Sequence, residues 1–120
     1  MAGWRKIVSG LRIDAKTGGN TVYLPPSAGG SKVKRVMYVI KRVDASATTD
    51  DLTLEIQHSP DSNLFKQHTV APALADIGDL MTYESNAAVI LGEYYRGAIT
   101  TASSSTAWFV VDVFESARPF

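Results

Sequence analysis

The residues best suited to chemistry are His58, His68 and Asp61, because two imidazoles and a carboxylate can hold a metal ion. The two histidines are the only ones in the chain, and they flank the segment Ser59 to Gln67. If that segment closes a hairpin, the two rings lie near each other. A histidine at a strand end is more often a hydrogen-bonding residue, however, and the sequence indicates no third firm ligand. We therefore predict no metal site.

Other motifs for catalysis are incomplete. Asp50 with Asp51, and Asp76 with Asp79, lack the spacing of a calcium loop, and acidic residues are common in β turns. Gly29-Gly30-Ser31-Lys32 lacks the order of a phosphate-binding loop, and no serine lies in Gly-x-Ser-x-Gly. The absence of cysteine excludes a cysteine nucleophile, a disulfide and a thiolate zinc site. We predict a protein that is not an enzyme and has no cofactor.

The elements that would position such residues are short strands. The clearest is Leu52 to His58, in which apolar and polar residues alternate strictly. Strands are predicted over 4–13 with a break at Ser9-Gly10, over 21–24, 33–43, 52–58, 64–70, 94–100 and 108–115, and within 80–83 and 88–91. Seven or eight strands without a long helix predict an all-β fold, a single-domain antiparallel β-sandwich of jelly-roll type.

The stretch Tyr94 to Glu115 contains two long apolar and aromatic runs, which we expect to form an antiparallel pair near the middle of a sheet. In the second run, alternation places Phe109, Val111 and Val113 on one face. The other face holds Trp108, Val110, Asp112 and Phe114. Because neither face is properly polar, the second face should be covered by another layer of the domain or by another protein chain.

The formal net charge of zero conceals a division along the chain. Residues 1–43 hold nine basic residues against one acidic residue, and residues 44–120 hold three against eleven. Strands from the two halves could interleave and cancel these charges. If they lie apart, the molecule has a positive and a negative side, which would favour head-to-tail docking.

One domain is expected over residues 1–120, with an extended N-terminal segment at 1–6 and a C-terminal tail at 116–120. The first residues do not form the continuous apolar run of a signal peptide, and no apolar span is long enough to cross a bilayer. We expect a product of the cytoplasm, or a component of a particle assembled there, without membrane contact.

The run Leu52 to Ser59, followed by Pro60-Asp61-Ser62-Asn63-Leu64-Phe65 and later by Tyr94-Tyr95-Arg96-Gly97-Ala98-Ile99-Thr100, resembles a pattern in small β-sandwich proteins of tailed bacteriophage particles. Among these it is similar to the capsid decoration, or cement, proteins. The resemblance implies a non-enzymatic structural protein on the capsid surface of the virion. It would bind the major capsid protein and stabilise the shell, as a homo-oligomer with a trimer favoured. The predicted partner-binding residues are Trp4, Arg5, Lys6, Lys34, Arg35, Trp108 and Phe114.

Two other functions stay open at this point. A carbohydrate-binding β-sandwich would use exposed aromatic rings, although Phe65 follows the turn where tryptophan is more usual. The aromatic candidates are Trp4, Trp108, Tyr94 and Tyr95. Nucleic acid would be bound by basic residues with Trp4, Tyr23 and Tyr38. We do not expect nucleic-acid binding, because the basic residues are distributed along strands as solvated positions are.

Overall fold

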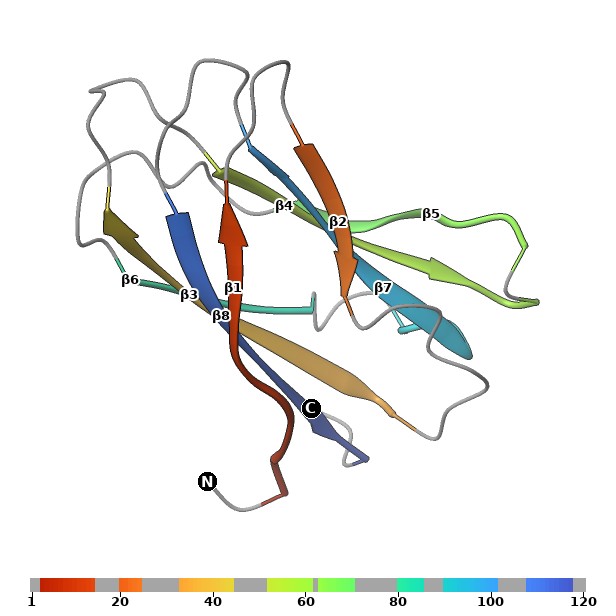
Figure 1. Cartoon of the computed structure of the whole chain (residues 1–120). Helices are drawn as coiled ribbons and strands as arrows, with labels where there is room; N and C mark the ends of the chain where they lie inside the picture. Colours follow the sequence, from red (N-terminus) through yellow and green to blue (C-terminus); the bar gives the residue numbers. More distant parts are fainter. Residues whose placement is uncertain are drawn as a thin grey trace.

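The computed structural model describes residues 3–14, 20–24, 33–44, 52–61, 63–70, 80–85, 90–101 and 108–117. These ranges form eight strands (Figure 1). The strands are β1 (Arg5–Asp14), β2 (Asn20–Leu24), β3 (Arg35–Asp44), β4 (Leu52–Ser59), β5 (Lys66–Val70), β6 (Leu80–Glu84), β7 (Tyr94–Thr101) and β8 (Trp108–Ser116). Within the same ranges, no helix has the length and apolar character to cross a membrane.

The strands form two four-stranded antiparallel sheets packed face to face (Figure 1). Sheet A has the order β1-β8-β3-β6, and sheet B has the order β2-β7-β4-β5. The predicted all-β sandwich is therefore confirmed. Apolar residues that alternate along each strand face the other sheet, because successive side chains point to opposite sides of a strand.

The pairing follows the order of a jelly roll. β1 pairs with β8, β2 with β7, β3 with β6, and β4 with β5, so the first strand lies beside the last and the pairing proceeds inward to the middle of the chain. Only β4 and β5 are consecutive neighbours in one sheet. Each of the other connections crosses from one sheet to the other, as in the two-sheet jelly rolls.

The core consists of the inward residues of the central strands. Phe109, Val111 and Val113 of β8 are fully buried, as the alternation predicted. Strands β3 and β4 contribute Val36, Tyr38, Ile40, Leu52, Leu54 and Ile56, and β7 contributes Tyr95 and Ile99. Removing these side chains from water is the main apolar contribution to stability.

Two buried tyrosines link the sheets. The Tyr38 hydroxyl, from sheet A, donates to the Leu24 carbonyl oxygen of sheet B at 2.9 Å. The Tyr95 hydroxyl, from sheet B, donates to the Glu115 carboxylate of sheet A. Burial raises the pKa of both phenols, so both hydroxyls remain protonated donors at neutral pH.

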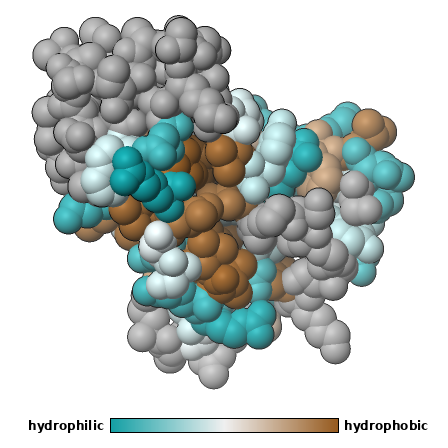
Figure 2. All heavy atoms as spheres, viewed as in Figure 1, coloured by the Kyte–Doolittle hydropathy of each residue, from teal (hydrophilic) through white to brown (hydrophobic). Residues whose placement is uncertain are grey.

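Strand β1, at one edge of sheet A, is irregular. Gly10 in β1 has a φ of 64°, and the register with β8 shifts on the N-terminal side of Leu11. This irregularity is the predicted break at Ser9-Gly10, and a glycine with positive φ is the usual device of such a bulge. Leu11 remains 37% exposed. Apolar residues gather on this side of the molecule between β1 and β2 (Figure 2).

One prediction about the sheet is wrong. The strands of the Tyr94–Glu115 stretch do not pair with each other, because β7 lies in sheet B and β8 in sheet A. Each is nevertheless a central strand. The connection between them is a crossing, which composition cannot distinguish from a hairpin loop.

Of the one or two strands expected within 80–83 and 88–91, the first is present as β6. Ile90 and Leu91 are not in a strand, and residues 88 and 89 lie outside the described ranges. The turn at 16–20 and the segment 71–79 also lie outside them, except Asn20 in β2.

We expect Gly97→Ala to destabilise the fold by about 1 to 3 kcal/mol, because overpacking a core has this effect. A Cβ atom at Gly97 would lie 2.6 Å from carbon atoms of the Tyr38 ring. Urea unfolding measures the change. The control is the same substitution in a Tyr38→Leu background, where the smaller side chain should relieve most of the cost. An equal cost in both backgrounds would show that the ring contact is not responsible.

Candidate functional site

The outer face of sheet A is the second apolar face that the sequence predicted. Trp108, Val110 and Phe114 of β8 point outward and are half-buried, in alternation with the buried core residues. Phe114 lies opposite Met37 in β3, and Met37 lies on this same face. The result is an apolar row across the middle of a sheet surface, where a solvated β-sandwich normally presents polar residues.

Basic side chains cover the aromatic rings of this face. The Arg12 guanidinium carbon lies 4.1 Å from the centre of the Trp108 ring, and the Lys6 ammonium lies 5.3 Å from that of Phe114. The Arg35 guanidinium lies 4.8 Å from the centre of the Trp4 ring. These are cation–π distances. The stems of the basic residues thus shield part of the apolar surface while their charged groups stay near water.

Acidic residues then neutralise these cations. Arg12 Nε donates to Asp14 Oδ1 at 2.9 Å, and Arg35 forms an ion pair with Glu84. The Asp112 carboxylate accepts a hydrogen bond from the Gly10 N–H at 2.6 Å and lies 3.8 Å from the Lys6 ammonium.

The charges of the two halves of the chain therefore interleave in sheet A. Three ion pairs of the described residues join a basic residue from the first half to an acidic residue from the second: Arg5 with Glu115, Lys6 with Asp112 and Arg35 with Glu84. Strands β1 and β3 bring the basic residues, and β8 and β6 bring the acidic ones. In sheet A, the strands of the two halves of the chain thus interleave and their opposite charges cancel locally, which is the first of the two alternatives that the sequence left open.

The predicted partner-binding residues are partly brought together. Five of the seven lie along the outer side of sheet A: Trp4, Lys6, Arg35, Trp108 and Phe114. Arg5 points to the other side, where it pairs with Glu115 at 3.1 Å. Lys34 is exposed, and its backbone N–H donates to the Ser116 carbonyl at 2.8 Å. Residues 5 and 6 thus begin β1, and residue 116 ends β8.

Sequence reasoning did not place Met37, Val39 or Arg12 on this face, and it left Val110 out of the predicted partner-binding residues. Val39 lies opposite Asp112, so it shares the outer side with Val110 and Phe114. The signal was present in the two-sided apolar character of β3 and β8. Only the neighbouring positions of β3 and β8 in sheet A, which the sequence did not reveal, join these residues into one surface.

The outer face of sheet B has a different chemistry. Its centre is Arg96 of β7, whose guanidinium carbon lies 4.1 Å from the centre of the Tyr23 ring and 4.2 Å from that of Phe65. Arg96 Nε donates to Gln57 Oε1 at 2.7 Å, and Gln57 Nε2 donates to Glu55 Oε1 at 3.1 Å. This face is therefore a polar network built around one stacked cation.

The two histidines meet at the end of β4 and in β5, as predicted for a hairpin. Their ring centres are 4.7 Å apart in an edge-to-face arrangement. His58 Nδ1 accepts a hydrogen bond from the Gly92 N–H at 2.9 Å. His68 Nδ1 lies 2.6 Å from the Thr69 hydroxyl.

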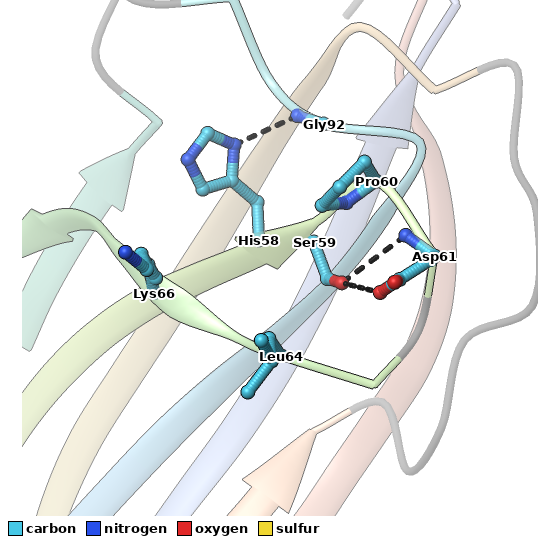
Figure 3. Close-up of a pocket in the computed structure, with 7 residues that line it drawn as sticks. All are labelled: His58, Ser59, Pro60, Asp61, Leu64, Lys66 and Gly92. Carbon is cyan, nitrogen blue, oxygen red and sulfur yellow. Dashed lines mark hydrogen bonds between the residues drawn. The ribbon is translucent and has the colours of Figure 1, made fainter.

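A cavity of about 440 Å³ lies beside His58 (Figure 3). Its lining residues are His58, Ser59, Pro60, Asp61, Leu64, Lys66 and Gly92. In Figure 3, Asp61 turns back toward Ser59 and away from the imidazole. The Ser59 hydroxyl donates to Asp61 Oδ1 at 2.9 Å, and the Asn63 N–H donates to the same oxygen at 3.0 Å.

The Asp61 carboxylate therefore organises the turn between β4 and β5. The hydrogen bonds from Asn63 and Ser59 lower its pKa, which keeps it ionised. Among the residues that the structure describes, no three histidine or acidic side chains gather as metal ligands would. Asp61, the carboxylate considered as a ligand beside His58 and His68, thus takes part in a turn of the kind that aspartate commonly forms.

The aromatic residues proposed for other ligands are dispersed. Tyr95 and Tyr38 are wholly buried in the core, so neither offers a ring to a sugar or a base. Trp4 and Trp108 lie against arginine side chains of sheet A, whereas Tyr23 lies on the outer face of sheet B. The sets selected for carbohydrate and for nucleic acid do not form one surface.

Comparison of the sequence with protein-family models gives no match, and neither does comparison with curated proteins. Among solved structures, the fold is similar to the crystal structure of the PBSX exported protein XepA, with a TM-score of 0.66 and 15% sequence identity. The alignment covers 99% of this chain and 38% of the XepA chain, so this chain spans well under half of that protein. At this identity the similarity shows a common fold.

We expect the free energy of unfolding to fall as the pH drops below about 6.5, the ordinary histidine pKa. Partial burial and the neighbouring His68 ring lower the pKa of His58. The folded state then binds fewer protons than the unfolded state between the lowered pKa and the ordinary one, so acid favours unfolding in that window. Above the window this contribution to stability is complete.

Denaturant unfolding between about pH 7.5 and 5.5, a range chosen to spare the carboxylates, measures this slope. The control is His58→Asn, whose amide oxygen can still accept the Gly92 hydrogen bond but does not titrate. We expect a shallower slope in this variant. An unchanged slope would assign the pH dependence to other groups.

Proposed function

We propose that this protein is a non-enzymatic structural protein of a bacteriophage particle, which binds the capsid shell through the outer face of sheet A. The observation that supports this is the half-buried apolar row of that face, formed by Val39, Val110, Trp108 and Phe114. Within the described ranges, no second layer of the domain covers these residues. A partner chain would complete their burial.

The composition of this face suits a protein contact. The cores of protein interfaces are enriched in aromatic residues, methionine and arginine, and this face contains Trp4, Trp108, Phe114, Met37, Arg12 and Arg35. Lys6, Arg12 and Arg35 already have acidic partners, so docking would not leave these three charges unpaired. The remaining polar groups would form the rim.

The assignment to a phage particle is supported by two independent similarities. The fold is shared with XepA, a phage-derived protein. The sequence pattern in β4, the following turn and β7 resembles the capsid decoration proteins. From that resemblance we take the finer proposal, in which the partner is the major capsid protein and the location is the capsid surface of a virion assembled in the host cytoplasm.

We expect Val110→Lys and Phe114→Lys to remove the protein from purified particles made by the genome that encodes it. Position 110 lies opposite Arg12 and Lys41, and position 114 lies opposite Lys6, so the added ammonium would lie beside another cation. Its desolvation on docking would be strongly unfavourable. Quantitative mass spectrometry of the particles measures the amount bound. The matched control is Thr53→Lys, at an exposed strand position on the outer face of sheet B, which should leave binding unchanged. Full retention of both sheet A variants would refute the proposed surface.

We also expect the purified protein to form a homo-oligomer, with a trimer favoured, because shell-binding proteins usually follow the symmetry of their lattice. Light scattering at low and high salt measures the mass. A closed oligomer that persists at high salt would be held mainly by apolar contacts, since salt screens only the exposed charges. A monomer at every salt concentration would contradict the oligomer and leave the shell contact to be tested by the particle experiment.

A further inference from the structure

Three arginines of the described residues stack on aromatic rings, and one of them differs from the other two. Arg12 and Arg35 are each paired with a carboxylate, from Asp14 and Glu84. Arg96 has the same kind of stacking, but its partner is the neutral amide of Gln57. Among the described residues, Arg96 makes no ion pair. Within the described ranges, its charge on the outer face of sheet B is therefore not paired with a carboxylate.

The Arg96 side chain is held rigidly. The Tyr23 ring from β2 and the Phe65 ring after the turn lie at nearly equal distances from the guanidinium carbon, 4.1 and 4.2 Å. The bond to Gln57 fixes the Nε edge. The two terminal nitrogens, Nη1 and Nη2, keep their N–H donors without a partner in the described part of the chain. A planar guanidinium fixed in this way is prepared for bidentate binding of a carboxylate or a phosphate.

The surroundings favour a ligand with hydroxyl groups. Thr21 and Thr100 point outward from β2 and β7 with their hydroxyls 3.1 Å apart, and Thr53 is exposed on the neighbouring β4. Glu55 supplies carboxylate oxygens that accept hydrogen bonds. The Tyr23 ring is 43% exposed at the edge of the sheet. A flat face with an accessible aromatic ring and many short polar groups is suited to stacking and hydrogen bonding with a sugar.

We propose that the outer face of sheet B is a binding site for a carboxylated carbohydrate, such as a glycan containing a uronic acid. The Nη atoms of Arg96 hold the sugar carboxylate, the exposed side of Tyr23 packs on the pyranose ring, and Glu55 binds hydroxyls of the same sugar. The threonine hydroxyls lie roughly 13 Å from Arg96 along β7, where they reach the next sugar of a glycan. A phosphate dianion fits less well, because the Glu55 carboxylate is linked to Arg96 through a single amide and repels the second negative charge. This site lies on the opposite face from the proposed shell contact and does not depend on it.

The experiment is an NMR titration of the isotope-labelled protein with sodium glucuronate. Glucose, sodium acetate and inorganic phosphate are the comparison probes at equal ionic strength. We expect glucuronate to shift the backbone amides around Gln57, Arg96 and Tyr23 and to bind more tightly than any of the other three. We expect Arg96→Gln to weaken glucuronate binding at least about tenfold, the usual scale for a charge-assisted bidentate contact.

Two further variants distinguish the positive charge of Arg96 from the planar, bidentate geometry of its guanidinium. Arg96→Lys keeps the charge but lacks this geometry and should also weaken binding, which a purely electrostatic attraction would not predict. Arg12→Gln removes an arginine with the same ring distance, 4.1 Å, on the other face and should change nothing at this site. A thermal melt of each variant shows whether it is folded. The wild-type titration decides the question even if Arg96 variants unfold.

Each alternative outcome overturns a stated part of the proposal. Equal binding of glucose and glucuronate would refute the role of the carboxylate. Acetate or phosphate binding as tightly as glucuronate would show a simple anion site and refute the carbohydrate. Shifts confined to residues outside sheet B, or no shifts, would refute the site itself. None of these results bears on whether the protein is retained on particles through sheet A.

Discussion

The contact between the Tyr38 ring and the backbone of Gly97 determines how the two sheets pack at the centre of the molecule. Because Gly97 has no side chain, β7 can lie directly on the ring, and the phenol reaches the Leu24 carbonyl in the far sheet. Tyr95 makes the reciprocal link to Glu115. Each hydroxyl donates from the core to a polar group of the opposite sheet, which makes this spacing and this register of the sheets more favourable than a shifted one.

The topology explains how the two outer faces arise from one chain. Since pairing begins with the first and last strands, each sheet contains strands from both halves of the sequence. In sheet A this places the basic β1 and β3 beside the acidic residues of β8 and β6, and the net charge of zero becomes a set of local ion pairs. The central strands β7 and β8 then turn their second faces outward on opposite sides of the sandwich.

The strands could be predicted from the sequence because alternation, β-branched residues and turn residues act locally. The burial of Phe109, Val111 and Val113 followed from the same alternation. The partners of β7 and β8 could not be predicted, because nothing local distinguishes a crossing loop from a hairpin loop. The face of sheet A was partly predictable from two-sided apolar strands. The Arg96 stack was not, because Tyr23 and Phe65 meet it only through the register of three separate segments.

The two faces differ in what each would cost to dehydrate, and this limits the partner that each can take. On sheet A, Lys6, Arg12 and Arg35 already have carboxylates beside them, so the hydration energy that these three cations lose under a docking chain is partly compensated within the protein. On sheet B, covering Arg96 with an apolar surface would bury an unmatched guanidinium. Only a ligand that brings its own negative charge avoids that cost. An apolar partner therefore suits sheet A, an acidic one suits sheet B, and neither surface substitutes for the other.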